Sequence, residues 1–162
     1  MRKSRSSSAQ KNIAAKLGID VSDDTHDVAA ARIHDAVATA IGQLPPKRST
    51  ARQRKFAEEI GIKVSKDTIR VASARIGDKL SQDNRHALQA LNLKPGDEVA
   101  LLEDFEIDGI ATDPRQRFIV SSIGSNGRVY FKGMNCPGAW PSQIKKVSGQ
   151  LFIQAEAARD SA

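Results

Sequence analysis

The most distinctive chemistry in this sequence is a concentration of positively charged side chains between residues 47 and 80. Ten basic residues stand there against four acidic ones, so this stretch carries as much net charge as the whole chain, +6. Clustered lysines and arginines attract phosphate, and each phosphate neutralised makes binding to duplex DNA more sensitive to salt. The sequence therefore predicts contacts with a nucleic-acid backbone at Arg48, Arg52, Arg54, Lys55, Lys63, Lys66 and Arg70. The plainer alternative is a charged, solvated pair of helices.

The basic stretch is the second copy of an internal repeat. A shift of 43 residues places residues 10–37 on residues 53–80 without a gap, and 14 of the 28 aligned positions are identical. Such self-similarity means that one small structural module occurs twice.

The two copies differ in charge at the positions that follow their shared glycine. Where the second copy has Lys63, Lys66 and Arg70, the first has acidic residues, namely Asp20, Asp23 and Asp27. We therefore expect the second copy to hold phosphate and the first to pack against protein.

Each copy has the pattern of a helix, a short extended loop and a second helix. Gly18 and Gly61 stand where the first helix would end in a left-handed conformation. Asp24 and Asp67 occupy the position of an N-cap for the second helix, whose free N–H groups could also meet a phosphate. We expect the copies to span 10–44 and 47–92, the latter with a trailing helix from residue 81 to residue 92.

This pattern resembles the helix–extended loop–helix modules related to SAP domains. The residues that carry the resemblance lie in the second copy: Thr50, Gln53, Phe56, Gly61, Ile62, Thr68, Ala72, Ser73, Ile76 and Leu80. The resemblance implies a tendency to bind DNA or RNA, although some such modules bind protein.

The chain changes character after a turn at residues 93–97. Short β-rich runs follow, and the stretch Gly124-Ser125-Asn126-Gly127 predicts a tight hairpin. The order of strands, long acidic loop (103–114), hairpin and short helical turn resembles an SH3-like barrel of the Tudor type. The sequence thus predicts an α+β protein, with tandem helical-hairpin repeats followed by a small SH3-like β-barrel at 95–154 and a tail at 155–162.

One strand of this region combines basic and aromatic side chains. Side chains alternate along a strand, so Val129 and Phe131 would face the core. A second set of nucleic-acid contacts would then face outward, namely Arg128, Tyr130 and Lys132. The alternative is one amphipathic tyrosine on an ordinary surface. Trp140 is expected to fill the barrel interior; the alternative, which the Tudor-type resemblance implies, is a place on a ligand-binding rim.

No set of residues has the spacing of a catalytic or metal site. Cys136 has no second cysteine with which to pair, and the three histidines are far apart in sequence. The sequence therefore predicts no catalytic residues, no metal and no cofactor. No apolar run approaches the length of a membrane span, and residues 1–9 are expected to form a basic flexible arm of a cytoplasmic protein.

These features favour a non-enzymatic nucleic-acid-binding protein of bacterial or phage type, with DNA preferred over RNA as its partner. The alternative is a protein–protein adaptor or accessory subunit, whose barrel and acidic first copy bind protein partners. The sequence leaves the oligomeric state, the strandedness of the nucleic acid and its sequence preference open.

Overall fold

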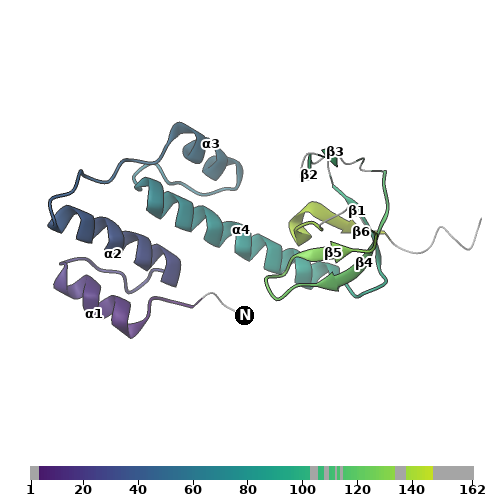
Figure 1. The fold of residues 1–162 in the computed structure, drawn as a ribbon, viewed down its shortest axis with the longest axis horizontal. Coiled ribbons are helices and arrows are strands. Elements are labelled where there is room, and N and C mark those ends of the chain that lie inside the picture. The colour runs from purple at the N-terminus through teal and green to yellow at the C-terminus, as the bar shows by residue number, and fades with distance from the viewer. Residues whose placement is uncertain are drawn as a thin grey trace, which may run out of the picture. The chain divides into compact units, whose positions relative to one another are not determined.

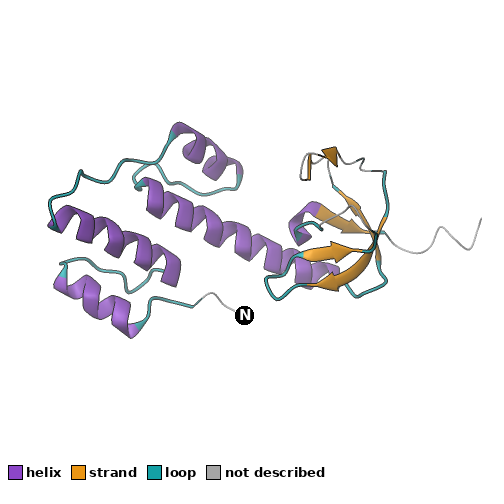
Figure 2. Cartoon of the chain, in the orientation of Figure 1, coloured by secondary structure: helices purple, strands orange, loops and turns teal. Residues whose placement is uncertain are grey.

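The computed structural model describes residues 4–102, 106–107, 110–111, 113, 115–133 and 138–147 of the chain. They fall into two compact units, Met1–Gln82 and Asp83–Ala162. Figure 1 labels the helices and strands, and Figure 2 shows that helices precede strands along the chain. The predicted α+β class is therefore confirmed.

The first unit contains α1, α2, α3 and most of α4, and the second contains the strands. The helices are α1 (Ser8–Lys16), α2 (His26–Ala40), α3 (Ala51–Glu59) and α4 (Ile69–Leu91). The strands are β1 (Glu98–Leu101), β2 (Glu106–Ile107), β3 (Ile110–Ala111), β4 (Phe118–Ile123), β5 (Val129–Phe131) and β6 (Ile144–Lys146), with a 3-10 turn at Pro141–Gln143. None of the described helices is both long and apolar enough to cross a membrane.

The two helical modules form as the repeat predicts. α1 and α3 each begin with a capping box, in which Ser7 pairs with Gln10 and Thr50 pairs with Gln53. Gly61 has a φ of 78°, and its counterpart in the first module is also left-handed, so the predicted ends of both first helices are confirmed. Each module has its own small core of an alanine from each helix and a valine from the loop: Ala14, Val21 and Ala29, and Ala57, Val64 and Ala72.

The predicted N-caps of α2 and α4 are wrong by one residue. Thr25 accepts the backbone N–H of Val28, and Thr68 does the same for its own helix. A threonine hydroxyl at this position reaches the third helical N–H. The preceding carboxylates of Asp24 and Asp67 turn instead toward arginines within their own modules.

Each module begins several residues before the aligned repeat, which covers residues 10–37 and 53–80. Arg5 pairs with Thr25 in an isolated antiparallel bridge, and Arg48 pairs with Thr68 in the same way. The repeat therefore starts near residue 4 and residue 47. Of the arm expected at residues 1–9, residues 4–9 belong to the first module and residues 1–3 lie outside the described residues.

The trailing helix expected from residue 81 is the continuation of α4. Ser81 donates its hydroxyl to the carbonyl of Gly77 at 2.7 Å, which satisfies it within the helix. The helix ends at Leu91 because Asn92 adopts a left-handed φ of 43°. The two compact units divide within α4, between residues 82 and 83.

The strands of the second unit form an open sheet within the described residues. Its order is β5-β4-β1-β6, with antiparallel neighbours throughout, and β2 pairs only with β3. The expected closed barrel is therefore wrong for this part of the chain. Residues 148–154 of the expected barrel, the tail at 155–162 and Cys136 lie outside the described residues.

The core of this sheet is built from alternating strand residues. Val129 and Phe131 are buried, as predicted, and the Phe131 ring stacks on Phe118 with centroids 4.8 Å apart. Trp140 does not fill the interior, because 36% of its surface is exposed. The two phenylalanines take the place in the core that sequence analysis gave to the tryptophan.

The hairpin between β4 and β5 uses the predicted glycine. The N–H of Gly127 bonds to the carbonyl of Gly124 at 2.9 Å, and Gly127 has a φ of 85°. Asn126 keeps a negative φ and accepts the N–H of Arg128 through its side chain at 3.0 Å. The turn is therefore a four-residue turn closed by one left-handed glycine.

The stability of the second unit is expected to depend on Asp97 at low pH. Its carboxylate accepts from Lys146 Nζ at 2.8 Å and from the Lys94 N–H at 2.7 Å, and these bonds lower its pKa from 3.8. A lowered pKa adds stability above pH 3.8 that disappears as the pH falls through the folded-state value. Asp97→Asn should therefore unfold more easily in urea at pH 7 yet lose less stability on acidification. Parallel losses in both proteins would contradict this.

Candidate nucleic-acid interface

The start of α4 is held by an extended segment that carries two of the basic residues. The N–H of Ile69 donates to the carbonyl of Lys47, and the N–H of Ser49 donates to that of Asp67, both at 2.9 Å. This pairing places Arg48 opposite Thr68. Basic side chains from the segment, the preceding loop and the helix therefore gather at one end of α4.

Three of the predicted arginines are engaged within the protein. Arg48 donates to the carbonyl of Lys66 at 2.5 Å, and Arg54 donates to the carbonyl of Ser49. Arg70 pairs with Asp35 at 3.1 Å. All three remain exposed to solvent. They contribute positive charge, but their positions are set by internal contacts.

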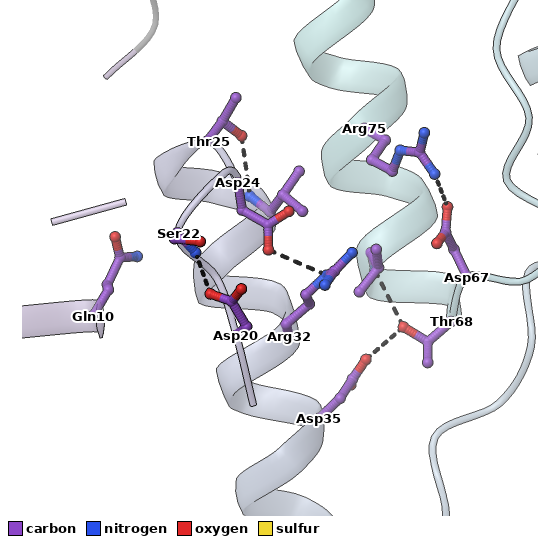
Figure 3. Close-up of polar contacts among 12 residues, drawn as sticks. Gln10, Asp20, Ser22, Asp24, Thr25, Arg32, Asp35, Asp67, Thr68 and Arg75 are labelled. Atoms are coloured by element: carbon purple, nitrogen blue, oxygen red, sulfur yellow. Dashed lines mark hydrogen bonds and ion pairs between the residues drawn. The ribbon is translucent and has the colours of Figure 1, made fainter. Parts of the chain in front are cut away.

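Asp35 is the residue that sequence analysis missed at this end of α4. Asp35 as a whole is 7% exposed, and its carboxylate accepts from the hydroxyl of Thr68 at 2.5 Å and from Arg70. Figure 3 shows Asp35 reaching from α2 to Thr68. The N–H of Val71 also bonds to that hydroxyl, at 3.3 Å. The N–H groups of Ile69 and Val71, at the start of α4, therefore already have acceptors within the protein.

The same contact recurs with the modules exchanged. The hydroxyl of Thr25, which starts α2, donates to Asp78 of α4. Asp35 and Asp78 occupy the same position of the repeat, as do Thr25 and Thr68. The two modules are therefore joined by a pseudo-twofold pair of threonine–aspartate bonds. The only sequence signal for this pairing was the identity of both residues in the two copies.

The aspartates that follow each loop stabilise their own modules. Asp67 pairs with Arg75 at 2.7 Å, and Asp24 pairs with Arg32 at 3.2 Å (Figure 3). Burial raises the pKa of Asp24, and the neighbouring Arg32 opposes this rise. Each of these two ion pairs joins residues of one module, so we assign both to the internal structure of the modules.

The remaining predicted residues of this module are solvent-exposed cations. They are Arg52, Lys55, Lys63 and Lys66. None of these four side chains forms an ion pair or a hydrogen bond with another described residue, although the backbone carbonyl of Lys66 accepts from Arg48. Lys63 and Lys66 lie on either side of Val64, which is 2% exposed and fixed between α3 and α4. This anchor holds the backbone of both lysines in a defined position.

The first module presents the opposite charge on the same backbone. Its loop valine, Val21, is equally buried, but Asp20 and Asp23 stand on either side of it. Asp20 accepts the N–H of Ser22 at 2.9 Å, and that bond lowers its pKa. The exposed loop of the first module is therefore anionic, whereas that of the second is cationic.

The second unit carries the other predicted contacts. Tyr130 on β5 and Lys132 just after this strand are exposed. Arg128 precedes β5 and is half-buried, and its Nη2 donates to the carbonyl of Gly138 at 3.2 Å. These residues lie on or beside one strand, but the arginine is held by the backbone beside it.

Among the described residues, no three His, Cys, Asp or Glu side chains are grouped closely enough to hold a metal ion.

No protein-family model, curated protein or solved structure matches the chain.

Proposed function

We propose that this protein is a non-enzymatic nucleic-acid-binding protein that grips the phosphate backbone through its second helical module. The observation that carries the proposal is the pair Lys63 and Lys66. Both are exposed, and their side chains have no ion-pair or hydrogen-bond partner among the described residues. Buried Val64 fixes the loop that carries them, and the corresponding loop of the first module carries aspartates. Charge is thus the main difference between two modules of one fold.

The grip would read the backbone and not the bases. Lysines bind phosphate as point charges, and contacts of this kind position a protein without specifying a sequence. Arg52 and Lys55 on α3 add to the positive potential of the module. We propose DNA over RNA as the preferred partner, with RNA as an outcome of the test below, and we propose that the sheet unit supplies a second contact.

Reversing the two loop lysines tests the grip. Fluorescence anisotropy of labelled duplex DNA, single-stranded DNA and RNA should be recorded at several salt concentrations. With Lys63→Glu and Lys66→Glu combined, we expect at least about 100-fold weaker binding at low salt, because two attractive contacts become repulsive. Loss of two phosphate contacts should also reduce the log–log salt slope on duplex DNA by about 1.8.

The matched control variant reverses the charge of two lysines of the first module, with Lys11→Glu and Lys16→Glu combined. Both are exposed, and the change in net charge is the same. If only total charge matters, the two double variants will bind equally weakly. Binding that survives reversal of Lys63 and Lys66 refutes the proposed grip.

The adaptor function remains the second candidate because the first module combines acidic and apolar surface. Asp20 and Asp23 are exposed, as are Ile41 at 66% and Leu44 at 89% of their surfaces. Under this alternative, no nucleic acid would bind even at low salt. Capture of a defined protein partner would instead be lost on reversal of Asp20 and Asp23.

A further inference from the structure

The outer face of β5 continues onto the segment that pairs with it. Val129 and Ala139 exchange both backbone hydrogen bonds, at 3.0 and 2.9 Å, and both side chains are buried. Residues on either side of such a pair point to the opposite face. Arg128 and Trp140 are therefore opposite each other on the outer face, and Tyr130 lies opposite Gly138.

Trp140 and Tyr130 are both accessible on this face. Trp140 stands between buried Ala139 and buried Pro141, which fixes its outward direction. It is 36% exposed, and Tyr130 is 37% exposed. Two large aromatic side chains thus meet solvent on adjoining segments of one small sheet.

The described residues that neighbour Tyr130 on the adjoining segments are small. A Cβ at Gly138 would lie 2.2 Å from the carbonyl oxygen of Val129, so this position can only be glycine. A Cβ at Gly124 would lie 3.1 Å from the Tyr130 ring, and the β4 partner of Tyr130 is Ser122, a small residue. No bulky neighbour at these positions can fold over the tyrosine.

Two cations flank β5, one directly before the strand and one directly after it. Arg128 is oriented by the carbonyl of Gly138, and Lys132 is exposed. Alternation along β5 gives both the same outward direction as Tyr130. They supply positive charge beside an aromatic surface, which is complementary to a base and its flanking phosphates.

We propose that Tyr130 and Trp140 form a stacking platform for the bases of single-stranded nucleic acid. A single strand is favoured because the bases of a duplex are stacked on one another and cannot offer their faces to a side chain. This inference rests on the proposed function and deepens it by naming the substrate class of the second contact.

Trp140 is the only tryptophan in the chain, so its fluorescence reports on this platform directly. The test titrates the full chain with an oligothymidine and with an abasic oligomer of equal length. We expect the oligothymidine to quench the tryptophan emission. The abasic oligomer should bind by anisotropy without quenching, because it has phosphates but no bases.

Substitutions then assign the effect to the aromatic rings. Tyr130→Ala should weaken oligothymidine binding by about tenfold and leave duplex binding unchanged, whereas Tyr130→Phe should retain the affinity. Ile119→Ala is the matched control, because Ile119 lies on the same sheet and is also 37% exposed without being aromatic.

The outcomes separate this inference from the proposed function. Binding of oligothymidine without quenching, and with no effect of Tyr130→Ala, would overturn the platform and leave the phosphate grip intact. Quenching that persists when Lys63 and Lys66 are reversed would support the platform and refute the grip as the main contact. Quenching by a protein partner but not by oligothymidine would overturn the platform in favour of a protein-docking surface.

Discussion

Replacing Gly138 with alanine is expected to lower the free energy of unfolding of the sheet unit by roughly 3 to 5 kcal/mol. Gly138 has a φ of 101°, and the added Cβ would lie 2.2 Å from the carbonyl oxygen of Val129. The atom it meets belongs to the backbone of β5 and cannot rotate away. Alanine would therefore force the 138–140 segment away from the strand with which it pairs.

Gly133→Ala separates the two causes of this loss. Gly133 has a φ of 112°, but a Cβ added there would meet no atom of a described residue within 4 Å, apart from its chain neighbours. It should therefore lose only the conformational contribution, about 1 to 2 kcal/mol. Urea unfolding followed by Trp140 fluorescence measures both variants in the same unit. Equal losses would show that the close approach to Val129 has no energetic consequence.

The parts of the fold that the sequence predicted are those set by local pattern. The paired helices of each module, the left-handed glycines and the inward direction of Val129 and Phe131 depend on residues within one or two turns or strands. The internal repeat strengthened these predictions, since each feature had to occur twice. The hairpin at residues 124–127 followed from its glycine alone.

The parts that the sequence did not predict depend on contacts between distant segments. Whether Asp67 or Thr68 caps α4 is decided by Arg75, which attracts the carboxylate. Trp140 was assigned to the core because large aromatics usually bury, but the stacked pair of Phe118 and Phe131 already occupies that space. The continuity of α4 past residue 81 likewise could not be seen from a change in composition.

The candidate interface shows the same division. Sequence analysis identified its basic residues from charge clustering, and four of those in the second module are exposed without a described partner. It could not tell that Arg48, Arg54 and Arg70 are held by internal acceptors. Asp35 comes from the other module and meets Arg70 only when the two modules pack together, whereas the carbonyls that hold Arg48 and Arg54 are positioned by the fold of the second module itself.

Removal of Asp35 is expected to change stability and nucleic-acid affinity in opposite directions. The carboxylate is buried and holds both Thr68 and Arg70, so Asp35→Ala leaves a hydroxyl and a guanidinium without their acceptor. Loss of hydrogen bonds to a charged group should lower the free energy of unfolding of the helical unit by about 3 kcal/mol. Urea unfolding followed by far-ultraviolet circular dichroism measures this loss.

Affinity for duplex DNA should rise a few-fold in the same variant, because Arg70 is no longer neutralised beside the loop that carries Lys66. Asp23→Ala is the matched control, since it removes one negative charge from an exposed position of the same unit. The free energy of unfolding of Asp23→Ala should change little. Its affinity for duplex DNA should rise only by the effect of removing one negative charge. Equal affinities of the two variants would show that Arg70 takes no part in phosphate binding, and the grip would then rest on Lys63 and Lys66 alone.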